Sequence, residues 1–474
     1  MKKCLLCLAL ACLLLCAAAI GESALPDGVY APDDFTFSGG TGRVTIICPR
    51  VTVVNGAAVA EIAFSSPNYT RVIVDGVEYA GEHTADSSIF EVPVPLNAEF
   101  LLTGTTTAMS RPHDIDYTLR ISLGAASGGM GGLTYESSLE LSHAEGFTVD
   151  YYAGGCALID INAVGRYLAV PEGMPAPEGL DADVIVLKKP IQNIYLTATS
   201  VMALVDRLDA LEAVRFSGTR AEGWSVEHAA ERMRSGEMLF AGKYSEPDYE
   251  LLVKEGCGLA VESTMILHAP KVLELLELLE MPVLIDRSSY EPHPLGRMEW
   301  IKLYGVLLDR EAEAGAFFAE QAAAVEALAG LPRTDKTVAF FYIGTDGQAV
   351  VRGASDYIAR MIELGGGVNV FADLTDSSDS RAAVSITMED FYAVAADADY
   401  LIYNAAIDKT VVCLDDLRAR SALLSDFKAV QNGDVWCAGR DLYQATDCTV
   451  DFIEDIHRML TGHADGMTFL DKLD

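Results

Sequence analysis

The sequence predicts an α/β protein with two doubly wound lobes joined by one long helix and preceded by a small all-β domain. From about residue 140 to the end, short apolar runs alternate with helical segments. Such alternation is typical of βαβ units, in which helices cover both faces of a parallel sheet. Residues 25–125 instead contain only short β-branched runs separated by turn residues, and Asp309 to Leu331 is one uninterrupted run rich in strong helix formers.

Hairpin signals define the all-β region at residues 25–125. The pairs Asn55-Gly56 and Asp75-Gly76 stand between apolar runs, and both positions of such a turn need a positive φ that these residues tolerate. A sandwich-like domain of about 100 residues is the expected result. The glycine-rich segment at 126–140 follows and is predicted to be a linker.

The long helix at 309–331 ends before Pro332 and divides the α/β region into two halves. At about 1.5 Å per residue it spans roughly 30 Å, the length of a small domain. We therefore expect the strand lead-in and first lobe at 141–308, the second lobe at 332–474, and a ligand cleft between the lobes. In such sheets ligands bind beyond the carboxyl ends of the strands.

Residues 1–24 resemble a secretory signal peptide. A short basic start precedes an apolar run from Cys4 to Ala19, which is too short to span a bilayer comfortably, and small residues follow up to Gly21. Cys12 and Cys16 leave open a lipid-modified cysteine that tethers the mature chain. In either case the mature protein is expected to be extracytoplasmic.

The six cysteines outside this segment are scattered and form no CxxC motif, so a zinc site is not expected. We expect isolated buried thiols. Secretion also permits a disulfide, for which Cys437 and Cys448 are the best pair.

Composition excludes several classes of function. The chain of 474 residues has 34 Lys and Arg against 69 Asp and Glu, a formal net charge of -35. This charge argues against nucleic-acid binding and against electrostatic docking on anionic lipid. The chain has no GxxxxGK[ST], GxSxG or HExxH motif, and its eight histidines form no close pair at helix spacing. A monomeric binding protein with no resident metal or cofactor is therefore favoured over an enzyme.

Six local patterns, in order, make residues 185–460 resemble the helical-backbone (class III) solute-binding proteins of ABC importers. They are Tyr195–Leu208, Phe240-Ala-Gly-Lys-Tyr-Ser-Glu-Pro-Asp-Tyr-Glu250, Gly258–Ser263, Met281-Pro-Val-Leu-Ile285, Leu364-Gly-Gly-Gly-Val-Asn-Val-Phe371 and Phe427–Trp436. Two features depart from the family plan: Gly256-Cys257-Gly258 replaces the usual Lys-Pro-Asp, and the all-β domain is an addition.

The resemblance implies capture of an iron chelate (siderophore or haem) or cobalamin in the cleft and its delivery to the permease. Iron or cobalt would then belong to the ligand. The family docks on its permease through one exposed acidic residue on each lobe. The matching positions are Glu291, which Pro292 and Pro294 would hold outward, and Glu389.

Candidate ligand contacts are the polar and aromatic residues of the loops at strand ends. Arginine and lysine could pair with an anionic chelate, and tyrosine could stack on a flat ligand or ligate iron. The candidates are Thr199, Ser200, Lys243, Tyr244, Ser263, Thr264, Ser288, Tyr290, Arg352, Arg440 and Tyr443.

Two alternatives stay open from the sequence. One is a secreted surface interaction or adhesion protein that acts through its β domain. The other is an uncharacterised enzyme on the same two-lobed scaffold, although the sequence shows no nucleophile–base signature for it.

Overall fold

The computed structural model describes residues 28–30, 32, 34–40, 44–54, 56–83, 87–108, 112–123, 133–374, 383–439, 441–463 and 465–474. The predicted signal peptide and residues 126–132 of the predicted linker lie outside these residues. The chain divides into two compact units, Met1–Gly132 with Pro177–Asp181, and Leu133–Ala176 with Ala182–Asp474. Each unit is described by itself below.

The first unit is a sandwich of two five-stranded antiparallel sheets whose buried side chains share one core. Its strands alternate between buried and partly exposed residues, as in β4, because successive side chains point to opposite faces. The rings of Phe64, Tyr69, Phe90 and Tyr117 pack together in this core. The Tyr69 and Tyr117 hydroxyls lie 2.6 Å apart, and Phe64 stacks on Tyr69. One sheet has the order β1-β3-β4-β8-β7 and the other β2-β10-β9-β5-β6. The strands are β1 Gly28–Tyr30, β2 Asp34–Gly39, β3 Ile46–Val54, β4 Ala57–Phe64, β5 Tyr69–Val74, β6 Val77–Ala80, β7 Glu82–His83, β8 Ser88–Pro93, β9 Glu99–Thr106 and β10 His113–Ser122.

The second unit begins with a five-stranded sheet where the sequence predicted only a linker end and a strand lead-in. Neighbouring strands are antiparallel except β14 and β15, which are parallel. Phe147 and Ile159 on this sheet belong to the same buried core as Trp300. The sheet is therefore packed on the α/β region and is not a free connection. Its strands are β11 Tyr135–Ser138, β12 Phe147–Tyr152, β13 Cys156–Ile161, β14 Gly165–Val170 and β15 Val184–Lys188.

The first lobe contains a five-stranded parallel sheet in the order β18-β17-β16-β21-β22. Its strands are β16 Ile194–Leu196, β17 Val214–Ser217, β18 Leu239–Phe240, β21 Leu259–Ser263 and β22 Val283–Asp286, and a small hairpin is formed by β19 Gly242–Lys243 and β20 Glu246–Pro247. Its helices are α2 Thr199–Arg207, α3 Glu227–Ser235, α4 Tyr249–Glu255, α5 Pro270–Leu278, α6 Pro294–Glu299 and α7 Ile301–Leu308.

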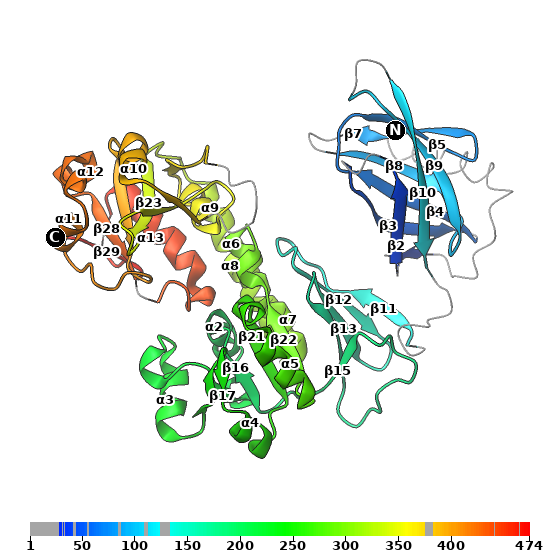
Figure 1. Ribbon diagram of the computed structural model, residues 1–474, viewed down its shortest axis with the longest axis horizontal. Helices are drawn as coiled ribbons and strands as arrows, with labels where there is room; N and C mark the ends of the chain where they lie inside the picture. Colours follow the sequence, from blue (N-terminus) through cyan, green and yellow to red (C-terminus); the bar gives the residue numbers. More distant parts are fainter. Residues whose placement is uncertain are drawn as a thin grey trace. The chain divides into compact units, whose positions relative to one another are not determined.

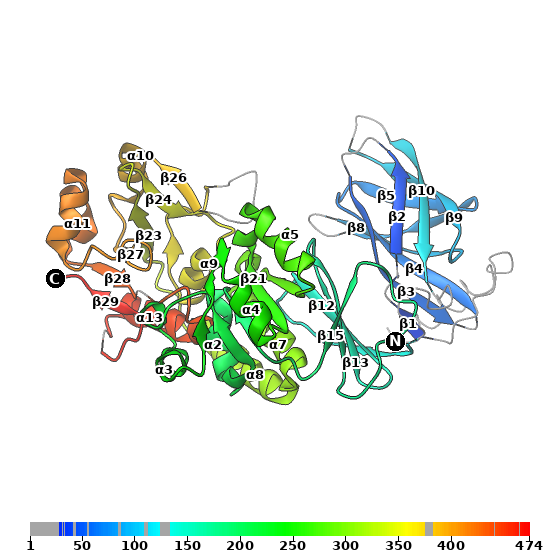
Figure 2. The same ribbon diagram turned by 60° about the horizontal axis from the view of Figure 1, so that its bottom comes forward.

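The connecting helix is α8, Glu311–Ala329. Its 19 residues span about 28 Å at 1.5 Å per residue, and it contacts α7 of the first lobe and α9 and α13 of the second. The first lobe is drawn in green and the second in yellow to red (Figures 1 and 2), and buried residues of both lobes belong to one core. The predicted fold class, two α/β lobes joined by one long helix, is confirmed.

The second lobe has a mixed sheet, whereas the sequence predicted a parallel one. Strands β23, β27 and β28 are parallel, but β24, β26 and β29 run antiparallel to their neighbours. The reason lies in the short connection from β23 to β24 through Gly347, at φ +80°, because a tight turn can join only antiparallel strands. The strands are β23 Thr337–Ile343, β24 Ala349–Arg352, β25 Val368–Asn369, β26 Ala383–Ile386, β27 Tyr400–Asn404, β28 Val435–Ala438 and β29 Leu470–Lys472. The helices are α9 Tyr357–Leu364, α10 Met388–Ala395, α11 Leu414–Arg420, α12 Lys428–Asn432 and α13 Thr449–Thr461.

Two further expectations can be compared with the described residues. Cys437 and Cys448 are not joined by a disulfide, and the other four cysteines outside the predicted signal peptide form none either. None of the described helices has the length and apolar character needed to cross a bilayer.

Candidate functional site

A cavity of about 170 Å³ lies between the two lobes. Its walls come from both lobes: the turn after β22 and helix α6 on one side, and the segment from β24 to α9 on the other. The lining residues are Ser289, Glu291, Arg297, Arg352, Asp356, Tyr357 and Tyr443.

Arg297 is the first-lobe cation of this cavity. It lies on α6, a helix whose six residues are all buried, and is itself only 8% exposed. Its guanidinium carbon lies 3.8 Å from the centre of the Tyr357 ring on α9, and Nη1 donates to the Ser289 carbonyl at 3.3 Å. The Arg297–Tyr357 stack therefore connects the two lobes through a cation–π contact.

Arg352 is the second-lobe cation, at the end of β24. It forms an ion pair with Asp356 at 3.3 Å and donates to the Tyr443 hydroxyl at 2.8 Å. The same hydroxyl accepts from Asn404 Nδ2 at 2.7 Å. Arg352 is thus held at the cavity wall by Asp356 and Tyr443, and Asn404 in turn holds the Tyr443 hydroxyl.

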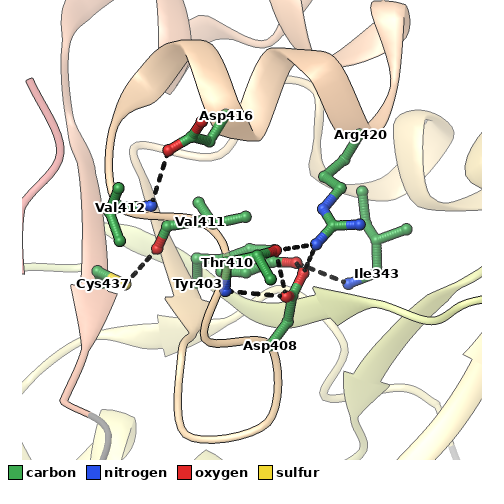
Figure 3. Close-up of polar contacts among 9 residues, drawn as sticks. All are labelled: Ile343, Tyr403, Asp408, Thr410, Val411, Val412, Asp416, Arg420 and Cys437. Carbon is green, nitrogen blue, oxygen red and sulfur yellow. Dashed lines mark hydrogen bonds and ion pairs between the residues drawn. The ribbon is translucent and has the colours of Figure 1, made fainter.

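The loop after β27 is fixed by a polar network around Asp408 (Figure 3). Asp408 accepts from the Tyr403 hydroxyl at 2.7 Å and forms an ion pair with Arg420 at 2.6 Å. Burial opposes ionisation of this carboxyl, but the hydrogen bonds from Thr410 and Tyr403 lower its pKa below the usual value. Because Asn404 is the last residue of β27, this network also fixes the strand end that contacts Tyr443.

The two carboxylates in the lining already have partners. Glu291 accepts from the backbone amides of Glu145 (3.0 Å) and Gly146 (2.8 Å) and from Trp300 Nε1 (2.9 Å). Asp356 accepts from the amide of Ile358 at 2.8 Å, which caps α9, and pairs with Arg352. These acids are structural acceptors within the protein.

Glu299 binds the backbone of residues 142–144, which directly precede the two residues that Glu291 binds. It is fully buried and accepts from the amides of Ser142, His143 and Ala144 at 2.7–2.9 Å and from Lys302 at 2.7 Å. Burial favours the neutral form, but the Lys302 and backbone hydrogen bonds outweigh it and lower the pKa of Glu299. Together Glu291 and Glu299 bind five consecutive amides and attach the lead-in sheet to the first lobe.

A stacked histidine pair lies beside this segment. The rings of His143 and His293 lie 4.5 Å apart at 14°, and His293 Nδ1 caps α6 by accepting from Leu295 N. Burial first, and then the nearby charges of His143 and Arg360, lower the pKa of His293 to about 4. His293 is therefore neutral at neutral pH and can act as the acceptor in this cap.

The lobes also meet directly on the side of α2 and α3. Arg207 forms an ion pair with Asp447 at 2.8 Å. Gln444 accepts from the amide of Ser225 at 2.9 Å and donates to the Gly223 carbonyl at 2.8 Å. These contacts close one edge of the cleft in this arrangement of the lobes.

The structure brings only two predicted ligand residues, Arg352 and Tyr443, to the cavity. Ser288 is buried and donates to Asp286 at 2.6 Å, and Ser263 accepts from the amide of Met265. Arg440 lies outside the described residues. The remaining candidates belong to the first lobe but are not among the lining residues: Thr199 and Ser200 begin α2, Lys243 is in β19, Tyr244 follows it, and Thr264 and Tyr290 lie in short 3₁₀ turns.

The prediction that Glu291 points outward is wrong. It is 4% exposed, because three donors hold its carboxylate inside the lobe. An exposed docking role for Glu291 is therefore withdrawn. Glu389, in the first turn of α10, is exposed as the docking prediction requires.

The residues that sequence reasoning missed are Ser289, Arg297, Asp356 and Tyr357. A signal existed for Arg297, because it stands in the short segment Pro294-Leu-Gly-Arg297-Met between apolar residues, where arginine is rarely buried without a reason. Tyr357 carried no such signal, since a tyrosine next to a helix start is ordinary. Within the described residues, no group of three or more His, Cys, Asp or Glu side chains is arranged to hold a metal ion.

A buried acid of the first lobe lies outside this cavity. Glu262, near the end of β21, is 0% exposed; one carboxyl oxygen accepts from the Thr197 hydroxyl and the other has no partner among the described residues. Burial raises the pKa of Glu262 to about 7, although the Thr197 bond opposes the shift.

Part of the chain matches a known family. Residues 259–441 match the family described as periplasmic binding protein. This segment includes β21 of the first lobe, all of α8 and most of the second lobe. This part of the chain is therefore similar to the periplasmic binding protein family, in agreement with the resemblance found in the sequence.

One curated relative and several solved structures are similar to the chain. An uncharacterized lipoprotein of Methanocaldococcus jannaschii, MJ0878, is 22% identical over 306 residues, which cover 60% of this chain and 69% of the relative. The haem-binding protein HutB of Vibrio cholerae (16% identity, 57% of this chain, 98% of that chain) has a TM-score of 0.47. The haem-binding protein RhuT of Roseiflexus sp. RS-1 (20%, 58% and 99%) has a TM-score of 0.45.

Proposed function

We propose that this protein is the extracytoplasmic solute-binding subunit of an ABC importer, secreted or tethered to the membrane. It captures an iron chelate or cobalamin between its lobes and delivers it to the permease. The observation that carries this proposal is the cavity to which both lobes contribute a buried or partly buried arginine. The family match over residues 259–441 supports the same class.

The geometry suits a carrier. The connecting helix α8 contacts helices of both lobes, so it limits how far they separate. At about 170 Å³ the cavity holds a compact group, and a ligand as large as haem or cobalamin requires the lobes to move apart from this arrangement.

Delivery requires surface residues that contact the permease. Glu389 is exposed in the first turn of α10, where a carboxylate is free to meet a basic pocket. This proposal places one docking residue on the second lobe and leaves the corresponding first-lobe residue unassigned.

The function is tested by equilibrium binding with the purified mature chain. The probes are haem, cobalamin and a ferric hydroxamate, each measured by titration and by the rise of the unfolding midpoint. A carrier binds at least one probe and releases it chemically unchanged. A probe that is converted to a product would contradict the carrier role and favour an enzyme.

A further inference from the structure

The interlobe cavity presents hydrogen-bond donors that the protein does not use up. Arg297 is 8% exposed and forms no ion pair within the described residues, and its charge acts on the buried Asp286 carboxyl only without direct contact. The single hydrogen bond it makes among these residues, to the Ser289 carbonyl, is long at 3.3 Å. A buried cation without a counter-ion is unfavourable, so this position favours an anion.

Two hydroxyls add to the set of donors. The Tyr357 hydroxyl is buried and has no partner among the described residues. The Tyr443 hydroxyl accepts from both Arg352 and Asn404, so its own proton remains available for donation. Both residues line the cavity.

The acidic residues of the lining do not supply the missing counter-ion. Glu291 is occupied by two backbone amides and Trp300. Asp356 is occupied by the α9 cap and by Arg352. The cavity therefore offers one unpaired guanidinium, a second guanidinium across the cleft and two hydroxyl protons to whatever enters it.

The cavity size limits the occupant. Its volume of about 170 Å³ equals roughly six water molecules at about 30 Å³ each. Pockets for larger organic ligands begin at about 300 Å³. The part of a ligand that enters this cavity is a compact group rich in acceptor oxygens.

We infer that this cavity binds a compact, multiply charged oxyanion group that bridges Arg297 of the first lobe and Arg352 of the second. This inference rests on the proposed function and names the chemistry of its ligand. The group is either an inorganic oxyanion or a carboxylate cluster of an organic ligand. Because its oxygens would contact both lobes, the anion would hold the lobes in the arrangement described here.

The test is calorimetric titration of the full mature chain with sulfate, phosphate and citrate, which separate the inorganic source from the carboxylate source. We expect at least one anion to bind and Arg297→Gln to weaken it roughly 10- to 100-fold, the loss typical of a hydrogen-bonded charge. Arg297→Lys, which keeps the charge, should recover part of the affinity. The matched control is Arg418→Gln, because Arg418 lies on α11 and pairs only with Asp415 at the surface; it should leave the affinity unchanged.

Three results would overturn the inference: none of the anions binds, an anion binds equally well to wild type and Arg297→Gln, or Arg418→Gln weakens binding as much as Arg297→Gln. A parallel titration with haem, cobalamin and the ferric hydroxamate separates this failure from that of the proposed function. If a chelate binds wild type and Arg297→Gln equally well and no anion binds, solute capture stands and the oxyanion site falls. If neither anions nor chelates bind, both fall.

Discussion

Replacement of Glu262 by glutamine should stabilise the second unit at high pH and not at low pH. In the folded state Glu262 is fully buried and its pKa is raised from 4.5 to about 7. Above pH 7 the folded protein must keep a buried carboxylate, whereas in the unfolded chain the carboxylate is hydrated. The stability that the neutral acid provides is therefore fully present below pH 4.5 and is lost as the pH rises through about 7.

The magnitude follows from the pKa shift. A shift from 4.5 to about 7 corresponds to about 3 kcal/mol at about 1.4 kcal/mol per pKa unit. Glutamine has nearly the same shape, and its amide oxygen can still accept from Thr197, but it cannot ionise. The buried amide has its own desolvation cost, which does not depend on pH. The quantity to compare is therefore the change in the effect of Glu262→Gln between pH 8 and pH 4.5, which we expect to be about 3 kcal/mol.

Urea unfolding followed by tryptophan fluorescence measures this quantity in the second unit alone, because all three tryptophans, Trp224, Trp300 and Trp436, belong to it. The control is Glu274→Gln, since Glu274 is exposed on α5. A difference between pH 8 and pH 4.5 below about 1 kcal/mol, or one no larger than that of the control, would refute the argument from burial.

Three other predictions follow from the same contacts. Glu299→Gln removes the charge that Lys302 and three backbone amides share, and it should destabilise the second unit by about 3–5 kcal/mol in the same urea assay; a loss below 1 kcal/mol would contradict it. The pKa of His293 in the folded state is lowered to about 4, so its contribution to the stability of the second unit is present above pH 6.5 and is lost as the pH falls toward 4. His293→Asn keeps the helix cap and should reduce the loss of stability between pH 6.5 and pH 4 by about 2 kcal/mol. An unchanged pH profile would argue against this prediction. Glu389→Arg should leave ligand affinity intact and abolish uptake by vesicles that contain the permease, and normal uptake would remove Glu389 from the docking surface.

Local sequence patterns were sufficient for the elements of this fold. The run from Asp309 to Leu331 predicted α8 within two residues at each end, because helix propensity and the following proline act over a few neighbouring positions. The alternation of strands and helices predicted both lobes for the same reason. The second-lobe sheet is nevertheless mixed, since the direction of β24 depends on one tight turn at Gly347.

The candidate site could be predicted only in part. Arg352 and Tyr443 were identified as polar residues near strand ends, and the structure places both at the cavity. Glu291 was predicted to be exposed because two prolines lie close to it in the sequence. No local pattern shows that the amides of residues 145 and 146 donate to its carboxylate. Arg297 was missed because its partner ring, Tyr357, lies 60 positions further along the chain.

The sequence by itself therefore determined the α/β fold class, the long connecting helix and the resemblance of residues 259–441 to periplasmic binding proteins. Each of these depends on interactions between residues close together in the chain or on motifs read in order. Only the tertiary structure decided which acids are buried, which arginine lacks a counter-ion and how large the interlobe cavity is. Charge pairing and burial depend on which distant segments meet when the lobes fold, so they become visible only in three dimensions.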